Sequence, residues 1–198
     1  MTFISVEGLD GSGTTTLVEE LSNVSNNVVT TFEPTNKKYG SMMRENLSQD
    51  TDPLEDFFLF MLDRRDHIEN FIKPKDTAGQ IVVSDRYIDS TRAYQPIALT
   101  EGEDAPFENT WQAKFFIEQT MADWEYEPDL TIYIDISVDT AIKRSSGEDK
   151  FENREFLEKA RNNYLALADH HDRIITISGE QSVDEMVKEA IDVIDENI

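Results

Sequence analysis

The chain has 198 residues, with 41 Asp and Glu against 18 Lys and Arg, so its formal net charge is −23. This length suits a single domain, 1–198, and the charge argues against binding to nucleic acid or to an acidic membrane, which would repel the protein. The absence of cysteine excludes disulfides and cysteine-rich zinc sites, and the lack of any run of about 18 apolar residues predicts a cytoplasmic protein with no membrane span.

The excess of acidic residues also indicates adaptation to high salt. Dissolved ions at molar concentration screen most of the self-repulsion that such a surface creates. A merely acidic protein from an ordinary cell is the alternative, and the dependence of stability on salt distinguishes the two.

Apolar strand-like runs alternate with helix-like stretches along the chain, which predicts a five-stranded parallel sheet with helices on both faces, a three-layer α/β sandwich. The expected strands are Thr2 to Glu7, Asn27 to Phe32, Gln80 to Ser84, Leu130 to Ile136 and Arg173 to Ile177. The clearest helices are Pro53 to Ile72, Asn109 to Trp124, Arg154 to Ala168 and Val183 to Ile194, the last with a capping box of Ser182 and Glu185.

The first strand leads into Gly8-Leu9-Asp10-Gly11-Ser12-Gly13-Thr14-Thr15, which fits the phosphate-binding pattern G-x-x-x-x-G-K-[ST] except at Thr14, where lysine is expected. In that pattern backbone N–H groups and the N-terminus of the next helix hold phosphates, and the hydroxyl at Thr15 binds Mg²⁺. An ordinary glycine-rich turn is the alternative. The residues predicted to form this phosphate site are Gly8, Asp10, Gly11, Ser12, Gly13, Thr14, Thr15 and Thr16.

Asp85 and Arg86 stand where the third strand ends, beside the expected phosphate loop. The ends of parallel strands are where ligands gather in such sheets. Arg86 can grip a phosphate with two parallel hydrogen bonds, and Asp85 can orient a water bound to Mg²⁺. A structural ion pair that closes the strand is the alternative role.

Two further pairs suit a nucleobase. Phe60 and Arg64 lie one helical turn apart, so a ring for stacking and a guanidinium for hydrogen bonding project together. Core packing of Phe60, with Arg64 reaching water, is the competing interpretation. Tyr94 and Gln95 add an amide that can pair with a base edge.

The segment Ser145 to Asp149 is polar, is predicted to be mobile and is bracketed by bases in an otherwise acidic chain, which places a candidate lid at about 144–153. These bases are Lys143, Arg144, Lys150 and Arg154. They predict a lid that closes over phosphates, although a solvated helix end with incidental charges is also open. The spacing of His67, His170 and His171 suggests no metal site, and Trp111 and Trp124 are expected in the core or at a subunit interface.

Together these motifs resemble the thymidylate kinase family, P-loop enzymes that transfer a phosphoryl group from ATP to dTMP. The resemblance covers nearly the whole chain. It is carried by Val6 to Gly13, Glu33-Pro34-Thr35, Phe60 to Arg64, Asp85-Arg86-Tyr87, Ala93-Tyr94-Gln95, Pro128 to Asp135, Lys150-Phe151-Glu152 and Tyr164-Leu165.

The resemblance implies synthesis of dTDP for nucleotide biosynthesis, with Mg²⁺ bound by Thr15 and Asp85, and a homodimer. By similarity, Asp10 contacts the deoxyribose, Phe60 stacks on thymine, and Arg86 holds the dTMP phosphate. Glu33, Arg64, Tyr94 and Gln95 complete the dTMP site. Asp85, Arg86, Arg144 and Arg154 are the implied catalytic residues, and Lys150 joins the ATP phosphate site.

Two residues depart from the family pattern: Thr14 replaces its lysine, and Phe32 stands where arginine often precedes Glu-Pro. Removing one preorganised donor of this kind lowers a rate by about 100- to 1000-fold. Three explanations stay open: a lid base such as Lys150 replaces the charge, cellular cations help, or the protein binds nucleotides without turning them over. Another nucleoside monophosphate kinase is the nearest alternative function.

Overall fold

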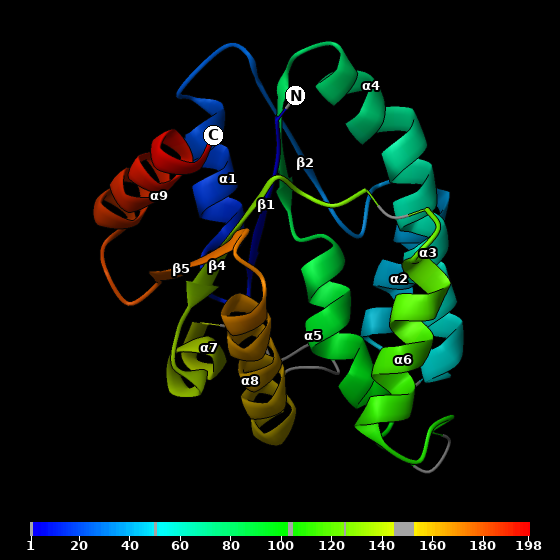
Figure 1. The fold of residues 1–198 in the computed structure, drawn as a ribbon. Helices are drawn as coiled ribbons and strands as arrows, with labels where there is room; N and C mark the ends of the chain where they lie inside the picture. The colour runs from blue at the N-terminus through cyan, green and yellow to red at the C-terminus, as the bar shows by residue number, and fades with distance from the viewer. Residues whose placement is uncertain (1, 50, 103–104, 125, 145–152) are drawn as a thin grey trace.

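The computed structural model describes residues 2–49, 51–102, 105–124, 126–144 and 153–198 (Figure 1). Its strands are β1 (Thr2–Gly8), β2 (Val28–Phe32), β3 (Ile81–Asp85), β4 (Leu130–Asp135) and β5 (Ile174–Ser178). Its helices are α1 (Thr14–Ser22), α2 (Lys38–Leu47), α3 (Pro53–His67), the π-helical η1 (Ile68–Ile72), α4 (Lys73–Thr77), α5 (Ile88–Ala98), α6 (Thr110–Met121), α7 (Val138–Arg144), α8 (Arg154–His170) and α9 (Val183–Asn197).

The five strands form one parallel sheet in the order β2-β3-β1-β4-β5. On one face Ile4 and Val6 of β1 pack with α1 and α9, and on the other Phe3 packs with α3, α5 and α6 (Figure 1). A third apolar cluster joins α5 to α8 through Tyr94 and Tyr164. The predicted fold is confirmed, and each strand end lies within one residue of its expected position.

The strand order changes direction at β1, with β3 on one side and β4 on the other. In open parallel sheets the crevice at such a point, beyond the carboxyl ends of the strands, is where ligands bind. The loop from Gly8 to Gly13 therefore emerges at the middle of this edge, between the ends of β3 and β4.

The predicted helix from Pro53 to Ile72 is more complex than expected. It is α-helical to His67, turns π-helical at Ile68–Ile72, and continues as α4. Pro74 accounts for the change, because a proline ring clashes with the carbonyl four residues earlier and offers no N–H to it. The sequence predicted one helix over this range and did not reveal the shift of hydrogen bonding.

Four helices, α2, α4, α5 and α7, lie outside the predicted helix ranges. In α5 the run Ile88 to Ala98 contains Pro96 and several polar residues, yet nearly all of it is buried. A helix buried on all sides lacks the one-sided stripe that periodicity detects. No helix of the described residues has the length and apolar character needed to cross a membrane.

Candidate active site

The loop after β1 curls tightly before α1 begins. Gly11 and Gly13 have φ angles of 78° and 102°, which L side chains rarely adopt. A Cβ atom on Gly11 would also lie 2.7 Å from Cβ of Arg144. The first four N–H groups of α1 have no partner inside the helix and carry its positive dipole, so the loop and the helix start form an anion cradle.

Thr15 and Asp85 meet at the mouth of this cradle. The Thr15 hydroxyl donates to Asp85 Oδ2 at 2.6 Å, while Asp85 Oδ1 is buried with no hydrogen-bond partner. Mg²⁺ prefers oxygen ligands, with one or two carboxylates and the rest from phosphates and water. A hydroxyl and an unpartnered carboxylate oxygen beside a phosphate cradle therefore fit Mg²⁺.

Arg86 reaches from the end of β3 back to the loop. Its guanidinium donates to the Gly8 carbonyl at 2.7 Å and to Asp10 Oδ1 at 2.6 Å, and it lies 5.6 Å from the ring centre of Tyr94. Burial would lower the pKa of Arg86, but Asp10 raises it well above its usual value, so the charge is fixed. Its φ of 64° is left-handed, a strained conformation for a residue other than glycine, of the kind that gathers at functional sites.

Two adjoining hollows open around Asp10 and Arg86. The inner pocket is lined by Asp10, Glu33, Pro34, Leu47, Phe60, Arg64, Arg86, Tyr87, Ser90, Thr91, Tyr94 and Gln95. The loop hollow is lined by Asp10, Gly11, Gly13, Thr14, Thr15, Thr16, Phe32, Glu33, Pro34, Asn36, Arg44, Leu47, Asp85, Arg86 and Arg144. Every residue predicted to bind dTMP lines the inner pocket, and most of the predicted phosphate loop lines the loop hollow.

Glu33 is held within the protein rather than presented freely to a ligand. Its carboxylate accepts from Arg64 at 2.9 Å and lies 2.9 Å from Nδ1 of His67, and all three side chains are buried. Burial alone would raise the pKa of Glu33, but Arg64 and His67 together lower it below its usual value. His67, for which the spacing of the histidines predicted no role, thus helps to fix the pair that supports the inner pocket.

The inner pocket offers an apolar wall and a few polar atoms. Phe60 and Tyr94 supply rings, and Gln95 Oε1 is buried with no hydrogen-bond partner. Arg64 donates to Thr91 at 2.8 Å and to the Tyr87 carbonyl at 3.0 Å. The sequence analysis did not identify Thr91, which lies on the same face of α5 as Gln95, one turn earlier. Predicting a helix over this stretch would have placed the two side chains together.

The bases of the predicted lid are separated in the structure. Arg144, at the end of α7, donates to the carbonyls of Gly11 and Gly179 and lines the loop hollow. Arg154 pairs instead with exposed Asp139 at 2.5 Å and lines neither hollow. Lys150 and most of the segment 144–153 lie outside the described residues. The lid, the binding of ATP phosphates by Lys150 and the catalytic role of Arg154 therefore stay predictions.

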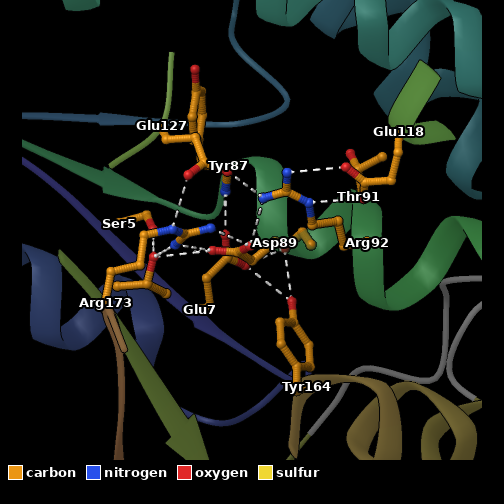
Figure 2. A network of polar contacts seen from close by, with 12 residues as sticks. Ser5, Glu7, Tyr87, Asp89, Thr91, Arg92, Glu118, Glu127, Tyr164 and Arg173 are labelled. Atoms are coloured by element: carbon orange, nitrogen blue, oxygen red, sulfur yellow. Dashed lines mark hydrogen bonds and ion pairs between the residues drawn. The ribbon is translucent and has the colours of Figure 1, made fainter. Parts of the chain in front are cut away.

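Beneath the two hollows, the buried Glu7 ties three elements together (Figure 2). It accepts from the Tyr87 N–H at 2.8 Å, from Ser90 at 2.5 Å and from the Tyr164 hydroxyl at 3.0 Å. The Tyr87 bond fixes the backbone directly after the strained Arg86. Glu7 therefore positions the turn from which Arg86 reaches the loop.

A second cluster anchors α5 to the end strand of the sheet (Figure 2). Arg173 forms two hydrogen bonds to buried Asp89, at 2.7 and 2.9 Å, and Arg92 bonds Asp89 and Glu118. Burial would raise the pKa of Asp89, but Arg173 and Arg92 lower it. The helix that lines the inner pocket is thus fixed at several points along its length.

We expect Glu7 to make the protein less stable as pH rises from about 5 to about 8. Burial, and then the charge of Asp89, raise its pKa from 4.5 to about 7, against the opposing effects of Ser90, Arg86 and Tyr164. Between pH 4.5 and about 7 the folded state binds more protons than the unfolded state, so raising the pH through this window favours unfolding. In urea unfolding across this range, the free energy of unfolding should fall less steeply with pH for Glu7→Gln than for the unsubstituted protein. Equal slopes against pH would contradict the prediction.

The parallel sheet of this order and the glycine-rich loop before α1 are those of a P-loop protein. A second pocket adjoins the loop hollow and shares Asp10 and Arg86 with it. A sequence model described as thymidylate kinase matches residues 6–191. The chain belongs to the thymidylate kinase family.

Individual relatives agree with this assignment. A probable thymidylate kinase of Halobacterium salinarum is 36% identical over 190 residues, which cover 94% of this chain and 92% of that protein. The crystal structure of thymidylate kinase from Ehrlichia chaffeensis is 29% identical, with a TM-score of 0.72 over 98% of each chain. The thymidylate kinase structure from Candida albicans, 22% identical, shares the fold with a TM-score of 0.85 over 99% of this chain and 92% of that one.

Proposed function

We propose that this protein transfers the terminal phosphoryl group of ATP to dTMP, giving dTDP for nucleotide biosynthesis in the cytoplasm. The observation that carries the proposal is the position of Asp10 and Arg86, which line both hollows. A nucleotide in each hollow brings its phosphates to the same two residues. Such positioning is most of what phosphoryl transfer requires from a protein.

The inner pocket suits thymine. Phe60 gives a surface for stacking, and the unpartnered Gln95 Oε1 can accept the one N–H donor on the thymine edge. Arg64 has five N–H donors, and its contacts with Glu33, Thr91 and Tyr87 leave donor capacity for a thymine carbonyl. Asp10 at the pocket rim is suited to the deoxyribose hydroxyl.

Thr15 and Asp85 would hold Mg²⁺, which would supply positive charge beside the phosphates of ATP. The loop N–H groups and Arg144 would hold the phosphates of ATP. Arg86 would grip the phosphate of dTMP, with Asp10 keeping its guanidinium in place.

Thr14 supports a second candidate function, nucleotide binding without turnover. An assay of dTDP formation with ATP and Mg²⁺, in low and molar KCl, separates the two, with dUMP, CMP and AMP as competing acceptors. Brisk turnover of dTMP supports the kinase; binding of dTMP by calorimetry with no product supports the silent protein. Faster phosphorylation of another monophosphate would make this a different kinase of the same fold.

We also propose that the protein forms a homodimer through an apolar patch made of Phe58 and Leu62 on α3 and Trp111 and Phe115 on α6. The side chain of Trp111 is 70% exposed and stacks on Phe115 at 5.6 Å, so Trp111 is not a core residue. The ring centres of Phe58 on α3 and Phe116 on α6 lie 6.3 Å apart, and this contact brings the two halves of the patch together. Large exposed apolar groups gathered in this way are typical of interfaces.

Replacing both Leu62 and Trp111 with glutamate should give monomers in sedimentation velocity, because each subunit would then bury charge against its partner. Val183→Glu is the control, since Val183 is as exposed as Leu62, at 46%, but lies on α9 at the other side of the sheet. A monomeric unsubstituted protein, or a double variant that still dimerises, would contradict the proposal.

Salt should stabilise the protein. At a net charge of −23 the surface repels itself, and raising KCl from about 0.1 M to about 1 M shortens the screening length from about 10 to 3 Å. We expect the melting temperature to rise by about 4 °C or more, equivalent to about 1 kcal/mol or more at this chain length. Scanning calorimetry at a series of KCl concentrations measures this, and a flat profile would favour the merely acidic alternative.

A further inference from the structure

Tyr164 of α8 is not among the residues that line either hollow, yet its hydroxyl reaches the groups that support Arg86. The residue is 1% exposed. Its hydroxyl donates to Glu7 Oε2 at 3.0 Å and lies 2.9 Å from Ser90 Oγ (Figure 2). Burial, and then the charge of Glu7, raise the pKa of Tyr164 well above its usual value against the opposing charge of Arg86, so the phenol keeps its proton and stays a hydrogen-bond donor.

Two routes lead from this hydroxyl to Arg86. Ser90 donates to Glu7 at 2.5 Å and accepts from the Arg86 guanidinium at 3.4 Å. Glu7 also accepts from the Tyr87 N–H at 2.8 Å, which fixes the backbone directly after Arg86. Glu7, Ser90 and Tyr164 together form the Glu7 cluster. Its tyrosine hydroxyl contacts both groups that support Arg86, one at the guanidinium and one at the backbone turn.

The ring of Tyr164 is held by two other tyrosines. It stacks on Tyr133 of β4, with the ring centres 4.8 Å apart, and meets Tyr94 of α5 edge-on, with the ring centres 6.1 Å apart. The Arg86 guanidinium lies over the Tyr94 ring. Packing on two sides fixes the Tyr164 ring, and with it the position of the hydroxyl.

The support of Arg86 matters because its backbone is strained. A left-handed φ of 64° persists only where the surrounding contacts over-determine it. Gly8 and Asp10 hold the guanidinium from the loop side, and the Glu7 cluster holds the guanidinium and its turn from beneath. Core packing alone would use only the ring of Tyr164. The bonds of its hydroxyl therefore indicate a task beyond packing.

We propose that Tyr164 is a positioning residue for phosphoryl transfer, whose hydroxyl holds Glu7 and Ser90 so that Arg86 meets the dTMP phosphate in its reactive orientation. The proposal rests on the proposed function. Phosphoryl transfer depends mainly on positioning and on preorganised charge. A misplacement of about 1 Å, caused far from the reacting atoms, can lower a rate by about 100-fold. A hydroxyl outside both hollows can therefore control the rate.

Tyr164→Phe tests this directly, because it removes the hydroxyl and keeps the ring. We expect kcat for dTDP formation to fall about tenfold, with the KM for ATP unchanged because Tyr164 does not line the loop hollow. Tyr126→Phe is the matched control. It also removes a tyrosine hydroxyl from a buried carboxylate, that of Asp76, but Tyr126 precedes β4 and lies at the opposite end of the strands. This control should leave kcat unchanged.

A double-mutant cycle with Glu7→Gln tests the route of the effect. If Tyr164 acts through Glu7, Tyr164→Phe should lower kcat by less than about threefold in the Glu7→Gln background, because residues that act as a unit are not additive. Thermal melting of every variant checks the fold. The proposal is wrong if Tyr164→Phe alone changes kcat by less than about twofold, or if it has the same effect in both backgrounds.

Calorimetry with dTMP and thymidine separates this proposal from the proposed function, because binding needs no turnover. Thymidine has no phosphate for Arg86 to hold. Tyr164→Phe should therefore bind dTMP about tenfold more weakly than Tyr126→Phe does, and thymidine equally well. Equal affinities for dTMP, or equal losses for both ligands, would overturn the role of Tyr164 even if the unsubstituted protein is an active kinase. Failure of the unsubstituted protein to bind dTMP would instead contradict the proposed function, on which this role rests.

Discussion

Replacing Arg86 with alanine should lower kcat/KM for dTMP by about 100- to 1000-fold, the expected loss for one preorganised charged donor at a reacting phosphate. Arg86 lines both hollows and is held by the Gly8 carbonyl and Asp10. Steady-state assays of dTDP formation at varied dTMP and saturating ATP measure the effect. Most of the loss should appear in kcat, because the charge on the phosphate changes most in the transition state, where Arg86 then stabilises it more than in the bound substrate.

Two further variants separate the charge of Arg86 from its backbone. Arg86→Lys keeps a cation but loses the paired hydrogen bonds, so it should recover only part of the rate. Arg86→Gly relieves the left-handed φ of 64°, and it should be as inactive as the alanine variant but more stable. An alanine variant that keeps more than about a tenth of the activity would contradict the assigned role.

The sheet could be predicted from sequence because each strand is a short apolar run closed by turn residues. Val82, Val83 and Leu130 to Ile134 are buried, so their strands are covered on both faces, which is the pattern that parallel strands show. The position of the glycine-rich loop could also be predicted, because its glycines and Thr15 follow the spacing of a known phosphate-binding pattern. Local chemistry was sufficient in both cases.

The parts that escaped prediction depend on contacts between distant residues. His67 and Glu33 are 34 residues apart, and nothing near either one indicates that they meet. Arg154 is a further example: the structure pairs it with Asp139, and it lines neither hollow, so its catalytic role stays a prediction.

Removing Arg64 should have the largest effect on stability. Its guanidinium lies 2.8 Å from Glu33 and both side chains are less than 5% exposed, so Arg64→Met leaves a buried carboxylate with His67 as its remaining basic partner. Breaking one half of a buried pair costs about 3–5 kcal/mol. Urea unfolding should show a lower midpoint with an unchanged slope, and the variant should also lose affinity for dTMP.

The adjacent Arg65 provides the comparison that makes this prediction decisive. Arg65 pairs with Glu69 one turn along the helix, but about half of its side chain is exposed, and such surface pairs contribute only about 0.3–0.5 kcal/mol. Arg65→Met should therefore leave the midpoint nearly unchanged. Removing both charges, with Arg64→Met and Glu33→Gln together, should recover part of the lost stability, because the uncompensated carboxylate is then gone. Similar losses for Arg64→Met and Arg65→Met would mean that the buried pair does not stabilise the inner pocket.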